Sequence, residues 1–255
     1  MPVGICKLCL KEKELQDSHL LGRAVYKVIR EEGEDPVVMT PDLIVSTSRQ
    51  VRAHLLCSDC EQRFSKNGEQ YFSSVMARKD KFVLLDLLQA VEPIEKQTDH
   101  VVYSGLGARI DTNKLAYYAL SVLWRSGVHQ WPTLGRQTTS VELVSHSEEI
   151  RRYLLEEVPF PADIVEVVTV CSDKASQFLA FTPSRYDMDS WVRYAMLVRG
   201  VYFRTMLGAT DNFKGICCVH SAPRKIFLAD CWKHSKASFA SLHKNAKVAR
   251  NIKQR

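Results

Sequence analysis

Two pairs of cysteines, each with two residues between its members, constrain this chain more than any other feature. The first pair is Cys6 and Cys9, and the second is Cys57 and Cys60. A C-x-x-C pair can hold one zinc ion through both thiolates, and two pairs complete a tetrahedral four-sulfur site. Four cysteine ligands leave no open position for a substrate. The spacing therefore predicts a structural zinc ion that joins two distant segments.

The remaining cysteines do not follow this spacing and lie scattered among apolar residues, at Cys171, Cys217, Cys218 and Cys231. A secreted disulfide scaffold is therefore a poor fit, and a reducing compartment fits better. The start of the chain lacks the basic and apolar segments of a signal peptide. No apolar run is long enough to span a bilayer. We therefore expect a cytoplasmic protein without a membrane partner.

The chain has 255 residues, enough for one large or two small domains. The strongest helix is predicted over 114–125, which is apolar on almost every side and follows the capping residues Asp111 and Thr112. We expect Arg125, at its end, to reach an internal carboxylate or a phosphate. Later strands are predicted at 164–171, 177–182, 194–202 and 225–228. This mixture indicates the α+β class.

Charge and composition divide the chain into three predicted parts. Residues 1–75 form the cysteine module, residues 76–232 form a larger α+β domain, and residues 233–255 form a basic C-terminal helix or tail. From Arg224 to the last residue the chain carries nine basic residues and one acidic residue, Asp230. Such a segment attracts phosphate backbones. It is equally suited to be a solvated terminal helix, and charge alone does not decide between the two.

Around the two cysteine pairs, residues 5 to about 72 contain a longer pattern: Cys6, Cys9, Asp17-Ser18-His19, Leu55-Leu56-Cys57, Cys60-Glu61 and Phe64. This pattern resembles the zinc-containing branch of the HNH (ββα-metal) endonucleases. It implies a zinc-stapled ββα-metal, treble-clef-like module followed by a larger α+β domain. It also implies that His19 is the general base, taking a proton from a water that attacks a phosphodiester. A single Mg²⁺ or Mn²⁺ ion would stabilise the developing charge.

Several positions depart from the family pattern. Ser18 stands where an acidic residue or a second histidine is usual, Gly22 replaces a common proline, and the family's asparagine is missing near Arg52. Glu61 follows the second cysteine pair, and a carboxylate there suits a hard cation. Glu69 lies about two helical turns further on, on roughly the same face. The expected ligands of the catalytic ion are therefore Asp17, Glu61 and Glu69, with His19 and Glu61 as catalytic residues.

Two functions follow from these residues. The first is a metal-dependent endonuclease that cleaves DNA rather than RNA, with a role in phage defence. Its second domain would serve substrate binding, homodimerisation or regulation. The second is a catalytically inactive zinc-knuckle module that binds nucleic acid or a protein; Ser18 and the missing asparagine favour it. Simpler roles also exist, because His19 would equally suit a loop hydrogen bond and Glu61 a helix N-terminus, where the helix dipole favours acids.

Overall fold

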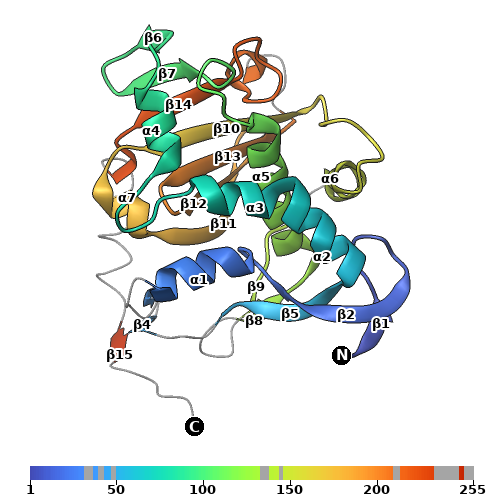
Figure 1. Cartoon of the computed structure of the whole chain (residues 1–255). Coiled ribbons are helices and arrows are strands. Elements are labelled where there is room, and N and C mark those ends of the chain that lie inside the picture. Colours follow the sequence, from blue (N-terminus) through green and yellow to red (C-terminus); the bar gives the residue numbers. More distant parts are fainter. Residues whose placement is uncertain are drawn as a thin grey trace.

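The computed structural model describes residues 1–31, 37–39, 43–46, 50–132, 138–143, 146–208, 213–232 and 247–249. Within them the chain forms a small N-terminal sheet and a large mixed sheet, with helices between the two (Figure 1). The α+β class is therefore confirmed. No helix in the described residues is both long and apolar enough to cross a membrane.

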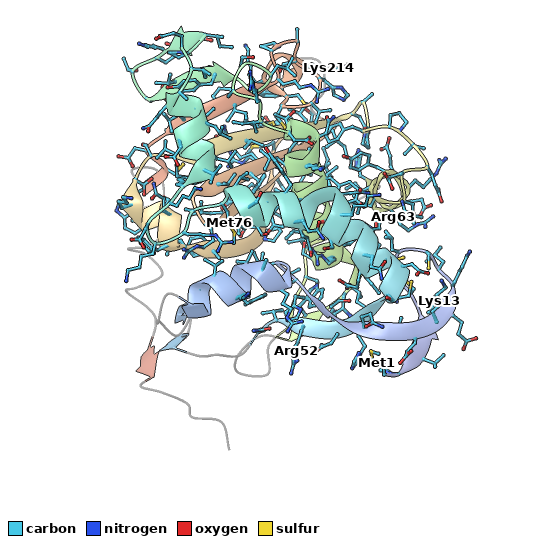
Figure 2. All side chains as sticks on the ribbon, viewed as in Figure 1. Met1, Lys13, Arg52, Arg63, Met76 and Lys214 are labelled. Carbon is cyan, nitrogen blue, oxygen red and sulfur yellow. The ribbon has the colours of Figure 1, made fainter. Side chains whose placement is uncertain are left out.

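The small sheet contains the strands that lie next to the four cysteines. Its strands are β1 (Val3–Ile5), β2 (Glu12–His19) and β5 (Arg52–Cys57), in the order β1-β2-β5. Both neighbouring pairs are antiparallel, and His19 lies opposite Arg52. Helix α1 (Arg23–Glu31) follows β2. Lys13 on β2 and Arg52 on β5 are labelled in Figure 2. Strand β5 then runs without a break into α2 (Ser58–Phe64).

Helix α2 continues through a wider, π-helical turn, η1 (Ser65–Glu69), into α3 (Gln70–Val75). Here the backbone comes close to helix α5 (Thr112–Val128). A Cβ atom on Gly68 would lie only 2.9 Å from the backbone nitrogen of Tyr118, so no larger residue fits without a shift. The glycine does not interrupt the helix, and it allows the helix to pack against α5.

The large sheet has seven strands in the order β11-β12-β13-β10-β14-β7-β6. Neighbouring strands are antiparallel except for the parallel pair β10–β14. The bounds are β6 (Glu95–Lys96), β7 (His100–Ser104), β10 (Ile164–Cys171), β11 (Ala180–Asp187), β12 (Val192–Val198), β13 (Val201–Leu207) and β14 (Lys225–Ala229). Helices α4 (Val83–Gln89), α6 (Ser147–Leu154) and α7 (Lys174–Phe178) complete this part, with a 3-10 turn at Lys214–Ile216.

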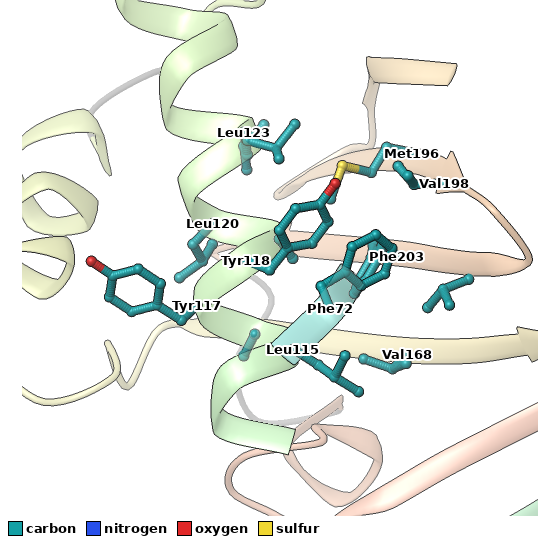
Figure 3. Packing of buried hydrophobic residues seen from close by; sticks show 14 of the residues in the cluster. Phe72, Leu115, Tyr117, Tyr118, Leu120, Leu123, Val168, Met196, Val198 and Phe203 are labelled. Carbon is teal, nitrogen blue, oxygen red and sulfur yellow. The ribbon is translucent and has the colours of Figure 1, made fainter. Parts of the chain in front are cut away.

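Helix α5 covers one face of the large sheet, which we call the inner face (Figure 1). The helix begins as predicted, because the Asp111 carboxylate accepts a hydrogen bond from the Lys114 backbone nitrogen at 3.1 Å. On the helix, Tyr118 stacks on Phe72 of α3 with ring centroids 3.9 Å apart, and Phe203 of β13 packs against both rings (Figure 3). Helix α3 and the large sheet therefore share one core.

That core crosses the boundary predicted at residue 75. A single cluster of buried apolar side chains extends from Leu8 and Leu20 in the N-terminal part to Phe203 and Ile226 in the large sheet. Burying apolar surface is the main source of folding free energy, so the two parts stabilise each other. The division into a module and a second domain stays a prediction about the organisation of the chain.

Short strands complete the described structure. They are β3 (Val37–Met39), β4 (Leu43–Ser46), β8 (Trp131–Pro132), β9 (Thr138–Thr139) and β15 (Lys247–Ala249). Most of 233–255, predicted as a basic helix or tail, lies outside the described residues. Where the segment is described, at β15, the backbone is extended and pairs in parallel with β4. The helix prediction is wrong at these three residues, because pairing with β4 requires an extended backbone.

Candidate metal centre and histidine site

The structure brings the four predicted cysteines together. The sulfur atoms of Cys6, Cys9, Cys57 and Cys60 all lie within 4.8 Å of one another, and all but Cys9 are buried. The first pair lies in the turn between β1 and β2, where Leu10 adopts a left-handed backbone (φ 59°) and donates its N–H to the Cys6 carbonyl at 2.9 Å. The second pair lies where β5 becomes α2. This cluster can hold a metal ion.

Hydrogen bonds bind the two cysteine segments even without an ion. The Cys57 backbone nitrogen donates to the Cys6 sulfur at 3.3 Å, and the Lys7 nitrogen donates to the Leu55 carbonyl at 3.1 Å. A hydrogen bond from Cys60 lowers the pKa of Cys6 to about 4. The same contact raises the pKa of Cys60. A second thiolate so close to Cys6 would be repelled, and a bound cation would remove that repulsion.

A pocket of about 390 Å³ opens beside the cysteines, and basic side chains line much of it. Lys13 and Arg63, labelled in Figure 2, are two of them. Each has an acidic partner: Lys13 pairs with Asp59 at 2.6 Å, and Arg63 pairs with Glu156. Their positive charge is therefore largely neutralised inside the protein, and we assign no ligand to this pocket.

His19 ends strand β2 and is held in one orientation. Its Nε2 atom lies 2.6 Å from the side-chain oxygen of Gln50, and its ring centroid lies 5.6 Å from that of Tyr26. An amide oxygen only accepts hydrogen bonds, so Nε2 carries the proton and Nδ1 keeps a lone pair. Burial lowers the pKa of His19. The imidazole is therefore neutral at pH 7, the state that a general base requires.

Arg125 connects the histidine site to helix α5. Its side chain is fully buried, and its two Nη atoms donate to the His19 carbonyl and to the Glu69 carboxylate, each at 2.7 Å. Gly22 makes room for that carboxylate, because a Cβ atom there would lie 3.1 Å from it and the backbone is left-handed (φ +80°). Arg125 thus reaches an internal carboxylate, one of the two partners expected for it.

Glu61 differs from Glu69 in having no ion-pair partner among the described residues. Within the same part of the chain its Oε1 atom is buried and makes no hydrogen bond. Burial raises the pKa of Glu61, although Arg125 and a hydrogen bond from Ser18 act in the opposite direction. Buried polar atoms are nearly always satisfied, so an orphan oxygen indicates a missing partner. Ser18 itself is fully buried and accepts a hydrogen bond from the Leu56 backbone nitrogen at 3.2 Å.

Asp17 lies apart from Glu61. Side chains alternate along a strand, so Asp17 and His19 point away from the face on which Ser18 meets α2. Asp17 instead forms an exposed ion pair with Arg52 at 2.6 Å. The ring of His19 contacts Gln50 and Tyr26. Ser18 thus contacts Glu61, and Glu69 forms an ion pair with Arg125. Among the described residues, Asp17 contacts neither glutamate.

Among the described residues, the four cysteines are one of three clusters of metal-ligating side chains, and no such cluster contains His19, Asp17, Glu61 or Glu69. Their catalytic and metal-binding roles stay predictions. Gln50 is the site residue that sequence reasoning missed. Its only signal is its place two residues before β5, near the position of the missing asparagine.

No family model, curated protein or solved structure gives a significant match to this chain.

Proposed function

We propose that the chain is a metal-dependent endonuclease of the HNH type, with His19 as the general base. One observation supports this most: Gln50 fixes a neutral imidazole with a free Nδ1 lone pair. On the opposite face of β2, Ser18 touches the Glu61 carboxylate with its orphan oxygen, so the scissile phosphate would have to lie at the end of the strand to meet both groups. The order β2, β5, α2 with cysteines at both ends agrees with a zinc-stapled ββα-metal module.

The side chains fit the two metals unequally. Four clustered sulfurs suit a structural zinc ion. For the catalytic Mg²⁺ or Mn²⁺ ion, the orphan Oε1 of Glu61 fits. Asp17 and Glu69 do not, because each is already bound to an arginine. We therefore assign the ion to Glu61, with substrate oxygens as further ligands.

In this proposal each residue has a limited task. His19 accepts the proton of the attacking water at Nδ1, while Gln50 keeps the ring in place. Arg125 holds the end of β2 through the His19 carbonyl. The ion, when bound, would stabilise the negative charge that develops on the phosphate. The net charge of +6 suits a polyanionic substrate, and we propose DNA rather than RNA.

The test is a plasmid-nicking assay with added Mg²⁺ or Mn²⁺. We expect the wild type to nick DNA and His19→Ala to lose about 100-fold or more of that activity, because general-base catalysis contributes factors of this size. Zinc content should stay unchanged in the variant. His54→Ala is the matched control: His54 lies on β5, opposite Asp17, and should leave activity intact. Equal activity in the His19 and His54 variants would contradict the role of His19.

A second candidate function is a zinc-knuckle module that binds nucleic acid without cutting it. It is favoured by the two arginines that neutralise Asp17 and Glu69, because such pairs remove carboxylates from metal binding. The same assay separates the two candidates. A wild type that binds DNA but never cleaves it, with any divalent metal, would leave the binding module as the function.

A further inference from the structure

The outer face of the large sheet, the one turned away from α5, carries two neighbouring arginines. Strand register places them there: Phe203 faces α5, so the next residue on β13, Arg204, points the other way. Arg204 lies opposite Ala195 on β12, and Arg193 lies two residues before Ala195. Residues related in this diagonal way lie within reach of long side chains. Arg193 and Arg204 are therefore neighbours on one face.

Aromatic rings accompany both arginines. The Arg193 guanidinium lies 4.8 Å from the ring centroid of Tyr186, its partner on β11. The Arg204 guanidinium lies 5.8 Å from the ring of Tyr202 on its own strand, and it donates one hydrogen bond to Thr169 at 3.2 Å. Ring faces attract guanidinium groups but carry no net charge. The two positive charges are oriented by these contacts and are not neutralised.

Neither arginine forms an ion pair with a carboxylate of the described residues, although other arginines of the chain do. The Nε atoms of Arg193 and Arg204 are buried and find no hydrogen-bond partner in the part of the chain that the structure describes. Like charges held close together repel, and burial adds to the cost of an uncompensated charge. A guanidinium stays charged at any pH that proteins tolerate, so deprotonation does not relieve this cost.

Among the described residues, Glu166 is the carboxylic acid that contributes to the main influences on the pKa of Arg204. It belongs to the inner face, where its neighbour across the sheet, Thr205, donates a hydrogen bond to it at 2.6 Å. Burial raises the pKa of Glu166 to about 8, so the group is mostly uncharged at pH 7. It therefore does not supply the missing negative charge.

Solvent can reach this arginine pair. The outer Nη atoms of Arg193 make no hydrogen bond with the described residues and are not among the buried atoms that lack a partner. Tyr186 is 44% exposed, and Ser184, which lies opposite the small residue Ala195, is also exposed. An incoming anion thus finds two guanidinium groups, a serine hydroxyl and one face of an aromatic ring.

We propose that this outer face binds a phosphate group of a nucleotide unit, with Arg193 and Arg204 donating to the same phosphate and Tyr186 stacking on the base. Phosphate offers several oxygens to two guanidinium forks, and bases stack on exposed aromatic rings at little cost in specificity. The unit belongs either to a free nucleotide or to single-stranded DNA. This site is separate from the histidine site and needs no divalent metal.

The experiment measures binding to the full-length protein without added divalent metal. The probes are inorganic phosphate, ADP and a fluorescein-labelled single-stranded oligonucleotide. We expect Arg193→Gln and Arg204→Gln each to weaken binding about 10-fold or more, because each removes charge-assisted hydrogen bonds. Arg185→Gln is the matched control. Arg185 also lies in the β11–β12 pair, but Glu142 and Asp187 already neutralise it, so affinity should change less than about 2-fold.

The probes distinguish the two sources of the phosphate. Binding of ADP supports a free nucleotide, and binding of the oligonucleotide alone supports a nucleic-acid strand. No measurable binding of any probe to the wild type would overturn the proposal, and so would equal affinities in the Arg204 and Arg185 variants. Thermal unfolding of each variant checks that the sheet remains folded. Because no cleavage occurs under these conditions, the result is independent of the role proposed for His19.

Discussion

Arg125 and Arg204 are both largely buried arginines, yet their surroundings are opposite. Arg125 is saturated: its guanidinium binds the Glu69 carboxylate, the His19 carbonyl and Ser121. Arg204 has one hydroxyl partner, one aromatic ring and a neighbouring arginine. A buried charge with all its partners inside the chain serves the fold. A buried charge without them raises the energy of the free protein and favours a ligand of opposite charge.

The regions around these arginines also differ in how they are held. The histidine site depends on long-range links, namely the cysteine cluster and the contacts of Arg125 to segments 56 and 106 residues away in sequence. The outer face belongs to a seven-stranded sheet whose strands are paired along their length. The first region should therefore respond to the loss of one link, and the second should tolerate a change of charge.

The largest effect is expected from removing the metal ligands. Metal binding to small zinc domains contributes on the order of 10 kcal/mol to folding, so Cys60→Ala should destabilise β2, β5 and α2 strongly. We expect hydrogen exchange of amides in β2 and β5 to become fast, while amides in β10 and β13 stay protected. Loss of protection in both sheets at once would show that the two regions do not differ in the way described.

The next largest effect on stability is expected from replacing Arg125, the arginine that forms a buried ion pair. Arg125→Met leaves Glu69 and the His19 carbonyl without their partner, and breaking a buried ion pair costs about 3–5 kcal/mol. Adding Glu69→Gln should recover part of this loss. Arg204→Met, by contrast, removes an unneutralised charge and should leave the free energy of unfolding unchanged or raise it. Chemical denaturation of the four proteins checks this; an equal loss in both arginine variants would abolish the contrast.

A smaller effect concerns Glu166, which lies on the inner face behind the arginine pair. Burial raises the pKa of Glu166 from its ordinary value of 4.5, which applies to the unfolded chain, to about 8 in the folded protein. Between these values the folded state binds more protons than the unfolded state, so stability falls as pH rises from 4.5 to 8. Glu166→Gln should lack this fall and be about 1–3 kcal/mol more stable than wild type at pH 8.5. At pH 5 the two proteins should differ little, which thermal unfolding across pH can test.

Some of this architecture is predictable from sequence because its cause is local. The spacing of the cysteine pairs predicts their cluster, since each pair is a self-contained chelate. The Asp111 cap and the apolar run after it predict α5. Strand 194–202 was predicted as one piece, but the structure turns within it. Arg199 and Gly200 both have positive φ and form a two-residue hairpin between β12 and β13. Of these two residues, only Gly200 is a type that indicates a turn in the sequence.

The candidate sites are less predictable because their geometry depends on register and on distant contacts. That Arg125 meets Glu69 follows from how α5 packs against η1. That Gln50 meets His19 follows from the pairing of β2 with β5. Arg193 and Arg204 become neighbours only because β12 and β13 pair in one register, and a shift of one residue would send one of them to the inner face.

The π-helical turn at Ser65–Glu69 has an evolutionary consequence. It holds an additional residue between the cysteine-bearing start of the helix and the part that packs on α5. If the same residues were wound as an ordinary helix, everything before the turn would be rotated by about 100°. Glu61 would then leave the side of the helix that it shares with Glu69, and the sulfur cluster would lose its alignment. We therefore expect the wider turn itself to be under stricter selection than most of the amino acids that form it.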